Sequence, residues 1–228
     1  MTEKLTDSKH DLSKTMEDKE EKDSEYISTG SSQTNYTSKN PKLRNFSIFN
    51  FSTREIILLS ILGIMGGIIS SLVPFDLLIK TWFPLVGGTQ LVSGHHLIWL
   101  VLGYGFTRKK SAILYVGMVK GFMDFMIGSQ WGLFEIVINI YEGFFLIIGF
   151  IIIENVFNER ETRLGYSIAG GIGNFTQVPL FWYITGKLVI YPTTLFIMAI
   201  MFAFLSGCII SGYLGKIILE KIEKAGII

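Results

Sequence analysis

Long apolar runs separated by short polar breaks fill the chain from about residue 55 onward. They cover residues 56–73, 85–106, 111–127, 133–153, 164–184 and 194–214, and an amphipathic Lys/Glu tail follows. About 20 mainly apolar residues let an α-helix cross the hydrocarbon core of a bilayer. The pattern predicts an all-α, polytopic membrane protein with six transmembrane helices in one domain over residues 46–228.

Residues 1–45 have a different character, because they are rich in Lys, Glu, Asp, Ser and Thr and have almost no aliphatic clusters. Such a segment cannot bury enough apolar surface to fold alone, so we expect a disordered tail. The segment also lacks the charged start and closely following apolar stretch of a cleavable signal peptide. We therefore expect the first crossing to target the chain to the cell membrane.

Basic residues are concentrated in alternate breaks between the apolar runs. One set of breaks carries Arg54, Arg108, Lys109, Lys110, Arg160, Arg163, Lys216, Lys221 and Lys224, and the other carries Lys80 and Lys187. Since cytoplasmic loops are enriched in Lys and Arg, both termini are predicted to be cytoplasmic. Loops 74–84, 128–132 and 185–193 then face outward and carry Trp82, Trp131 and Tyr191, which fit either an aromatic belt or a site.

Composition excludes several function classes. Only 17% of residues are charged, the net charge is +1, and the basic residues form no single stripe, which argues against nucleic-acid binding. The single cysteine, Cys208, excludes an internal disulfide, and adjacent His95 and His96 point about 100° apart on a helix, which disfavours a metal site. The chain has no nucleotide-binding loop, zinc-protease motif or nucleophile elbow, so we expect no enzyme activity, catalytic residue or cofactor.

Polar side chains inside a crossing are costly, so they are candidates for function. The fourth crossing carries Glu135, Asn139 and Glu142 along one helical stripe below Trp131. This stripe is the strongest indication of a ligand site, although hydrogen bonds between helices would also explain it.

Two other crossings add amide and aromatic groups to this candidate site. The fifth contains Asn174, Gln177 and Trp182, and the second contains Gln90 and His96. Aromatic rings can stack on a flat ligand while amides and carboxylates bond its edge. This combination favours a small heterocycle with polar edges.

Two further features keep alternatives open. Lys120 and Asp124 share one face of the third crossing, where the ion pair that they can form is either structural or functional. Small residues at four-residue spacing mark faces for close helix contact: Gly63, Gly67 and Ser71 in the first crossing, and Gly207, Ser211 and Gly215 in the last. The first of these faces packs either within the chain or against a partner subunit.

Together these features resemble the S components of energy-coupling-factor (ECF) transporters, and most closely the thiamine-precursor (hydroxymethylpyrimidine/thiamine) type. The resemblance covers about residues 55–220. It rests on residues 90–99 leading into Thr107-Arg108-Lys109-Lys110, on 121–132, on Glu142-Gly143, and on Leu205-Ser206-Gly207 through Gly212-Tyr213-Leu214-Gly215-Lys216. One departure bears on the ligand, since related proteins have an acidic residue where this chain has Gln90.

The resemblance implies a substrate-capture subunit that binds a vitamin-like ligand in an outward-facing pocket capped by loop 74–84. It further implies that Gly63, Gly67 and Ser71 dock on a transmembrane coupling protein that works with two cytoplasmic ATPases. A stand-alone, ion-coupled secondary transporter would instead use Lys120, Asp124, Glu135 or Glu142 as carriers, and a membrane enzyme acting on lipid would need Asp124, Glu135 and Glu142.

Overall fold

The computed structural model describes residues 50–72, 88–129, 131–157 and 161–226. Contacts divide the chain into units Met1–Phe46 and Ser47–Ile228, and all the described residues belong to the second. The predicted tail over residues 1–45 and the predicted capping loop over 74–84 therefore lie outside the described residues. Every regular element among the described residues is helical.

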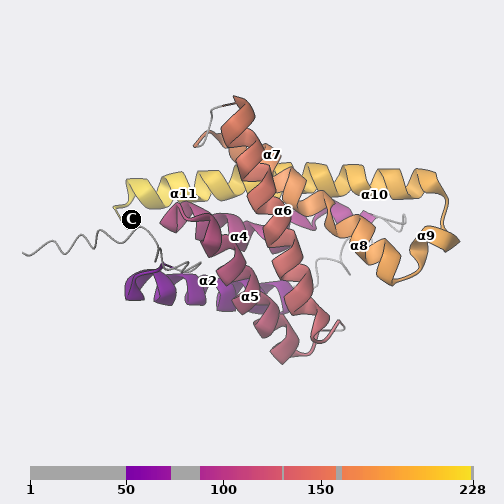
Figure 1. The fold of residues 1–228 in the computed structure, drawn as a ribbon, viewed down its shortest axis with the longest axis horizontal. Helices are drawn as coiled ribbons and strands as arrows, with labels where there is room; N and C mark the ends of the chain where they lie inside the picture. The colour runs from indigo at the N-terminus through magenta and orange to yellow at the C-terminus, as the bar shows by residue number, and fades with distance from the viewer. Residues whose placement is uncertain (1–49, 73–87, 130, 158–160, 227–228) are drawn as a thin grey trace, which may run out of the picture. The chain divides into compact units, whose positions relative to one another are not determined.

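Helices occupy each of the apolar runs (Figure 1). In chain order they are α2 (Thr53–Leu72), the short 3₁₀ helix η2 (Gly88–Leu91), α4 (Gly94–Thr107), α5 (Lys110–Ile127), α6 (Phe134–Phe157), α7 (Arg163–Phe175), α8 (Gln177–Ile184), α9 (Lys187–Ile190), α10 (Thr193–Ser206), the π-helical η3 (Gly207–Leu214) and α11 (Gly215–Lys224). The prediction of an all-α fold is confirmed over the described residues.

Within the part of the chain that the structure describes, three helical stretches are long and apolar enough to cross a membrane: Thr53–Leu72, Phe134–Phe157 and the continuous Thr193–Lys224. The other predicted crossings fall short as single helices for physical reasons. The second is split into η2 and α4, and the fifth ends at Thr176 before continuing as α8. The third, α5, carries Lys110, Lys120 and Asp124 within 18 residues.

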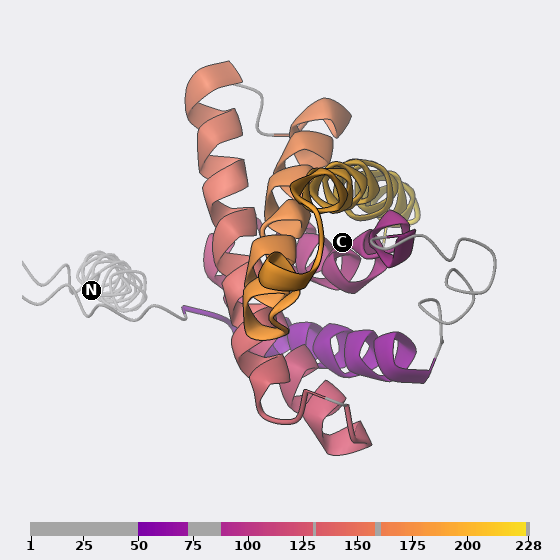
Figure 2. The same cartoon turned by 90° about the vertical axis from the view of Figure 1, so that its right-hand side faces the viewer.

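The last helix is longer than predicted. Elements α10, η3 and α11 follow one another as one rod, seen lengthwise in Figure 1 and end-on in Figure 2. Its 32 residues span about 48 Å, which exceeds a hydrocarbon core of about 30 Å, so the charged residues of α11 extend beyond the apolar layer. The Lys/Glu tail is thus part of this helix.

Side chains bond the backbone inside the π-helical segment. Ser211 Oγ donates to Gly207 O at 2.6 Å, and Ser167 Oγ of α7 donates to Cys208 O at 3.0 Å. Gly207 and Gly212 lie against the backbone of α7, which confirms the close helix contact predicted for the Gly207 face. The wider turn of the π-helix, and the lack of a side chain at Gly207 and Gly212, together let η3 and α7 approach this closely.

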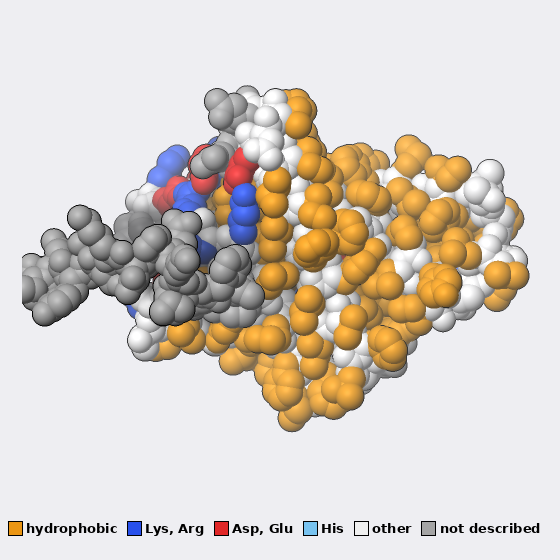
Figure 3. All heavy atoms as spheres, in the orientation of Figure 1, with side chains coloured by type: hydrophobic (Ala, Val, Ile, Leu, Met, Phe, Trp, Pro, Cys, Tyr) orange, Lys and Arg blue, Asp and Glu red, His pale blue; other side chains and the backbone are white. Residues whose placement is uncertain are grey.

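Helix α4 lies at the centre of the main apolar core. Leu97, Leu100 and Val101 are fully buried and pack with Ile113 of α5 and Leu146 of α6. A smaller cluster, Val178, Trp182, Ala199 and Ala203, joins α8 to α10. Outside the core, hydrophobic side chains cover most of the face shown in Figure 3, as expected for a surface in contact with lipid.

The small-residue face of α2 packs within the chain. A Cβ at Gly63 would lie 2.7 Å from Val119 Cβ, and one at Gly67 would lie 3.0 Å from Lys120 O, so both glycines face α5. Ser71, the third member, donates to Asp124 of α5. The assignment of this face to a partner subunit is therefore corrected: α5 covers it. The opposite side of α2, with Ile57, Ile61 and Met65, is exposed.

Glycines also set the contact between α5 and α6. A Cβ on Gly121 would lie 2.7 Å from Ile136 Cα and 2.8 Å from Glu135 O, and one on Gly117 would lie 2.9 Å from Asn139 O. Because these neighbours are backbone atoms, they cannot move aside as a flexible side chain does.

We therefore expect Gly121→Ala to destabilise the protein by about 1 to 3 kcal/mol, the usual cost of overpacking. Thermal unfolding of the purified protein in detergent measures this change. Gly143→Ala is the matched control, since its new methyl group would meet only side-chain atoms, the nearest at 3.2 Å. Equal thermal stability of Gly121→Ala and the wild type would contradict the close α5–α6 contact.

Candidate functional site

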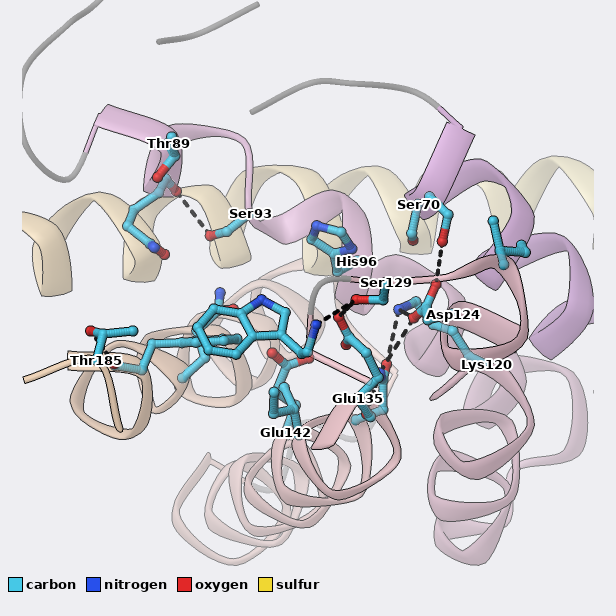
Figure 4. Close-up of a pocket in the computed structure, with 18 of the residues that line it drawn as sticks. Ser70, Thr89, Ser93, His96, Lys120, Asp124, Ser129, Glu135, Glu142 and Thr185 are labelled. Carbon is cyan, nitrogen blue, oxygen red and sulfur yellow. Dashed lines mark hydrogen bonds and ion pairs between the residues drawn. The ribbon is translucent and has the colours of Figure 1, made fainter. Parts of the chain in front are cut away.

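A cavity of about 510 Å³ lies among the ends of α2, α5 and α8 and the starts of α4 and α6. Figure 4 shows His96, Lys120, Asp124, Glu135 and Glu142 gathered around it. Of the residues predicted to bind substrate, those that line the cavity are Gln90, His96, Trp131, Glu135, Asn139, Glu142, Gln177 and Trp182. The structure thus brings together residues from elements far apart in the sequence.

Asn174 is the exception among the predicted site residues, because it does not line the cavity. It is fully buried and donates to Ser93 Oγ at 2.7 Å and to Ala203 O at 2.6 Å. Its own side-chain oxygen accepts from Gln177 Nε2 at 2.7 Å. Asn174 therefore holds the cavity-lining Gln177 and Ser93 in place from behind.

Lys120 and Asp124 form a buried ion pair on the cavity wall, with 2.8 Å between Lys120 Nζ and Asp124 Oδ2. Lys120 also donates to Asn139 Oδ1 at 2.9 Å, and Ser71 Oγ donates to Asp124 Oδ1 at 3.0 Å. This group ties α2, α5 and α6 together. Burial is tolerated because each charge has an opposite charge and a hydrogen-bond partner.

Asn139 has a structural task in addition to its place in the cavity. Its amide nitrogen donates to Glu135 O at 2.8 Å and more weakly to Asp124 at 3.4 Å, while its oxygen accepts from Lys120. Few hydrogen-bonding positions are left for a ligand.

The turn after α5 positions Glu135. Gly128 takes a φ of +96°, which suits glycine, and ends the helix, and the chain then reverses toward α6. Ser129 Oγ donates to the Glu135 carboxylate, and the backbone N–H of Trp131 donates to the same hydroxyl at 3.3 Å. Ser129 therefore links the turn to the predicted polar stripe.

Glu142 differs from the other carboxylates of the cavity. It is 4% exposed, lines the cavity, and has no hydrogen-bond or ion-pair partner among the described residues. Gln90 Oε1 and Ser70 Oγ, also on the cavity wall, are buried and unpaired as well. Glu142, Gln90 and Ser70 thus offer the cavity two hydrogen-bond acceptors and one hydroxyl.

Aromatic side chains form another part of the wall. The Trp131 and Phe181 rings have centroids 4.9 Å apart, and Trp182 packs on Phe196 at 5.2 Å. Both tryptophans and Phe181 line the cavity. A flat ligand could stack on these rings while its edge reaches the acceptors.

Several cavity residues were not predicted, among them Ser70, Thr89, Ser93, Ser129, Phe181, Thr185 and Lys187. Hydroxyl residues are common near helix ends, so their presence in the sequence does not identify them as cavity residues. The close approach at Gly117 and Gly121 had a signal, because these glycines repeat at the same four-residue spacing as the face of α2.

A second hollow, lined by Arg54, Ile57, Leu58, Ile61, Leu62 and Phe106, is almost entirely apolar. It opens on the exposed side of α2 and lacks the convergent polar groups of a specific ligand site. The polar cavity is the better candidate.

The other ends of the same helices carry a network of ion pairs. Arg108 contacts Glu161 and Glu223, Lys109 contacts Glu55 at 2.8 Å, Lys110 contacts Glu154 at 2.7 Å, Arg163 contacts Glu220 at 2.6 Å, and Lys216 contacts Glu161 at 3.3 Å. Charged side chains gather at this end in Figure 3. The helices therefore have a charged end and an end that holds the cavity.

Residues 54–176, more than half of the chain, match the family described as "ABC-type cobalt transport system, permease component". The chain belongs to this permease family. This membership confirms the prediction of a transport protein and not an enzyme. Together with the apolar helices, it also identifies the permease as a membrane protein.

The permease is also similar in fold to a solved structure described as "Crystal structure of an S-component of ECF transporter". The TM-score is 0.67 at 19% identity, and the match covers 78% of this chain and 88% of the other. No curated protein sequence matches the chain. The chain is therefore a transport permease by family and shares its fold with this S component.

Substitutions at Asn139 and at Glu142 should affect the stability of the protein differently, because Asn139 makes several hydrogen bonds and Glu142 has no partner among the described residues. Asn139→Ala should destabilise the ligand-free protein by about 1.5 to 3 kcal/mol, because Lys120 loses a hydrogen bond to a charged group. Glu142→Gln should leave stability unchanged or raise it, since Glu142 makes no hydrogen bond or ion pair with the described residues that the variant would lose. Thermal unfolding in detergent compares the two variants, and an equal loss in both would refute this distinction.

Proposed function

We propose that the protein is the substrate-capture subunit of an ECF-type vitamin importer. It binds a thiamine precursor, such as hydroxymethylpyrimidine, or a similar small heterocycle in the polar cavity. Six transmembrane helices surround that cavity, with both termini in the cytoplasm. Membership of a transport permease family and the S-component fold support the general role, and the chemistry of the cavity supports the ligand class.

The unpartnered Glu142 is the observation that carries the ligand assignment. A buried carboxylate that lacks a partner within the protein is stabilised by a ligand that supplies a positive charge or N–H donors. Gln90 Oε1 accepts a further donor, and Trp182 provides a flat apolar surface. An amino-substituted aromatic ring presents this combination of a flat face and edge donors.

The family is described by cobalt transport, so a metal ion is the natural competitor for the cavity. The described residues contain no group of three His, Cys, Asp or Glu side chains that could hold a metal ion. Amides and tryptophans are poor ligands for such an ion but good contacts for an organic ring. The cavity therefore favours an organic ligand over bare cobalt.

The charged end of the helices supports the proposed orientation. Among the described residues, Arg54, Arg108, Lys109, Lys110, Arg163, Lys216, Lys221 and Lys224 lie at that end, and Lys187 is beside the cavity. By the positive-inside rule the charged end is cytoplasmic and the cavity faces outward.

Capture alone does not drive uptake, and this chain has no nucleotide-binding motif. We propose that a transmembrane coupling protein and two cytoplasmic ATPases supply the energy. Since α5 covers the small-residue face of α2, the coupling protein would bind elsewhere on the apolar surface.

Tryptophan fluorescence of the purified protein tests ligand capture, because Trp131 and Trp182 line the cavity. Titration with thiamine, hydroxymethylpyrimidine and a panel of other vitamins should give saturable quenching with at least one of them. Glu142→Gln should weaken that binding about 10- to 100-fold, as expected from the loss of a hydrogen bond to a charged group.

Glu220→Gln is the matched control, since it makes the same chemical change at an exposed ion pair with Arg163 at the other end of the helices. Its affinity should equal that of the wild type. If the folded wild-type protein responded to no vitamin, the proposed ligand class would be wrong.

Dependence on partners is tested in vesicles. The protein reconstituted alone should bind the ligand without accumulating it, and accumulation should require coexpressed coupling and ATPase subunits together with ATP. Uphill uptake by the chain alone, driven by a proton or sodium gradient, would instead establish an ion-coupled secondary transporter.

A further inference from the structure

The charges around the cavity are unevenly compensated. Its lining contains Lys120, Asp124, Glu135, Glu142 and Lys187. Lys187 is exposed to solvent, where its charge is screened, whereas the side chains of Lys120 and Asp124 are only 2% and 6% exposed. The buried cation is the one that could attract a negatively charged ligand.

Asp124 neutralises this buried cation. Its Oδ2 lies 2.8 Å from Lys120 Nζ, and its other oxygen is held by Ser71 Oγ at 3.0 Å. Asn139 takes a second N–H of Lys120 at 2.9 Å. The third N–H of Lys120 can still donate to a neutral acceptor, but the positive charge is already paired.

The other acidic side chains of the cavity supply no positive charge. Glu142 has no partner among the described residues, and Glu135 is held by the uncharged hydroxyl of Ser129. An anionic group entering the cavity would meet these acidic side chains without a buried, unpaired cation to stabilise it.

We propose that Asp124 is a specificity-determining residue. By neutralising Lys120, it makes the cavity accept neutral or cationic heterocycles and exclude anionic ones, such as the phosphate ester of the same heterocycle. This inference rests on the proposed function, since it takes the cavity as the ligand site.

The test compares thiamine with thiamine monophosphate, and includes inorganic phosphate as a simple anion, by tryptophan fluorescence. The wild type should bind thiamine far more tightly than its phosphate ester and should not respond to inorganic phosphate. Asp124→Asn preserves the size of the side chain and frees the charge of Lys120. It should shift the ratio of the two affinities toward the phosphate ester by about tenfold or more and give a saturable response to inorganic phosphate.

Two variants separate charge from structural damage. The double variant Lys120→Gln/Asp124→Asn has no buried cation and the same net charge at the pair as the wild type, so it should retain the wild-type preference. Lys120→Gln alone leaves Asp124 uncompensated and should shift the preference further away from the phosphate ester. This variant decides the question if thermal unfolding shows that Asp124→Asn does not fold.

A folded Asp124→Asn protein that kept the wild-type preference and ignored phosphate would overturn the inference, as would a wild type that bound both ligands equally. If the wild type bound no heterocycle, the proposed function would fail. The titration with inorganic phosphate would still test the role of Asp124. If Asp124 neutralises Lys120, the Asp124→Asn protein should respond to phosphate and the wild type should not.

Discussion

A charge inside an apolar bundle must be compensated by groups that the fold itself supplies, and much of this structure follows from that requirement. Lys120 is buried at the wall of the cavity, where Asp124 and Asn139 satisfy it. This is possible because Gly117 and Gly121 let α5 approach the backbone of α6, which brings Asn139 within reach. Ser71 then connects α2 to the same pair. The cavity wall is therefore a polar network made from three helices.

The distribution of the remaining charges gives the molecule two functional ends. At one end, basic residues and glutamates in or next to the ends of α2, α4, α5, α6, α7 and α11 pair with one another, mostly with partial exposure to solvent. At the other end, Glu142 has no partner among the described residues. Exposed pairs contribute little individually, whereas an unpaired buried carboxylate is costly. Such a group is retained more readily when a ligand supplies the missing partner.

Much of the fold could be predicted from hydropathy, because long apolar runs in a membrane have few alternatives to helix. The breaks at Ser93 and Thr176 were harder to predict, since short interruptions leave the apolar pattern intact. The stripe of Glu135, Asn139 and Glu142 could be found because helical spacing alone puts these residues on one face. The position of Asn174 behind the cavity, and the packing of Gly63 and Gly67 on α5, depend on which helices become neighbours, and one sequence does not encode that directly.

The structure of the protein with its bound ligand tests the central claim most directly. The account predicts a heterocycle in the polar cavity, stacked on Trp182 or Trp131, with a cationic or N–H group within hydrogen-bonding distance of the Glu142 carboxylate. A ligand bound outside this cavity, or one that lies within it and leaves Glu142 without a partner, would contradict the account.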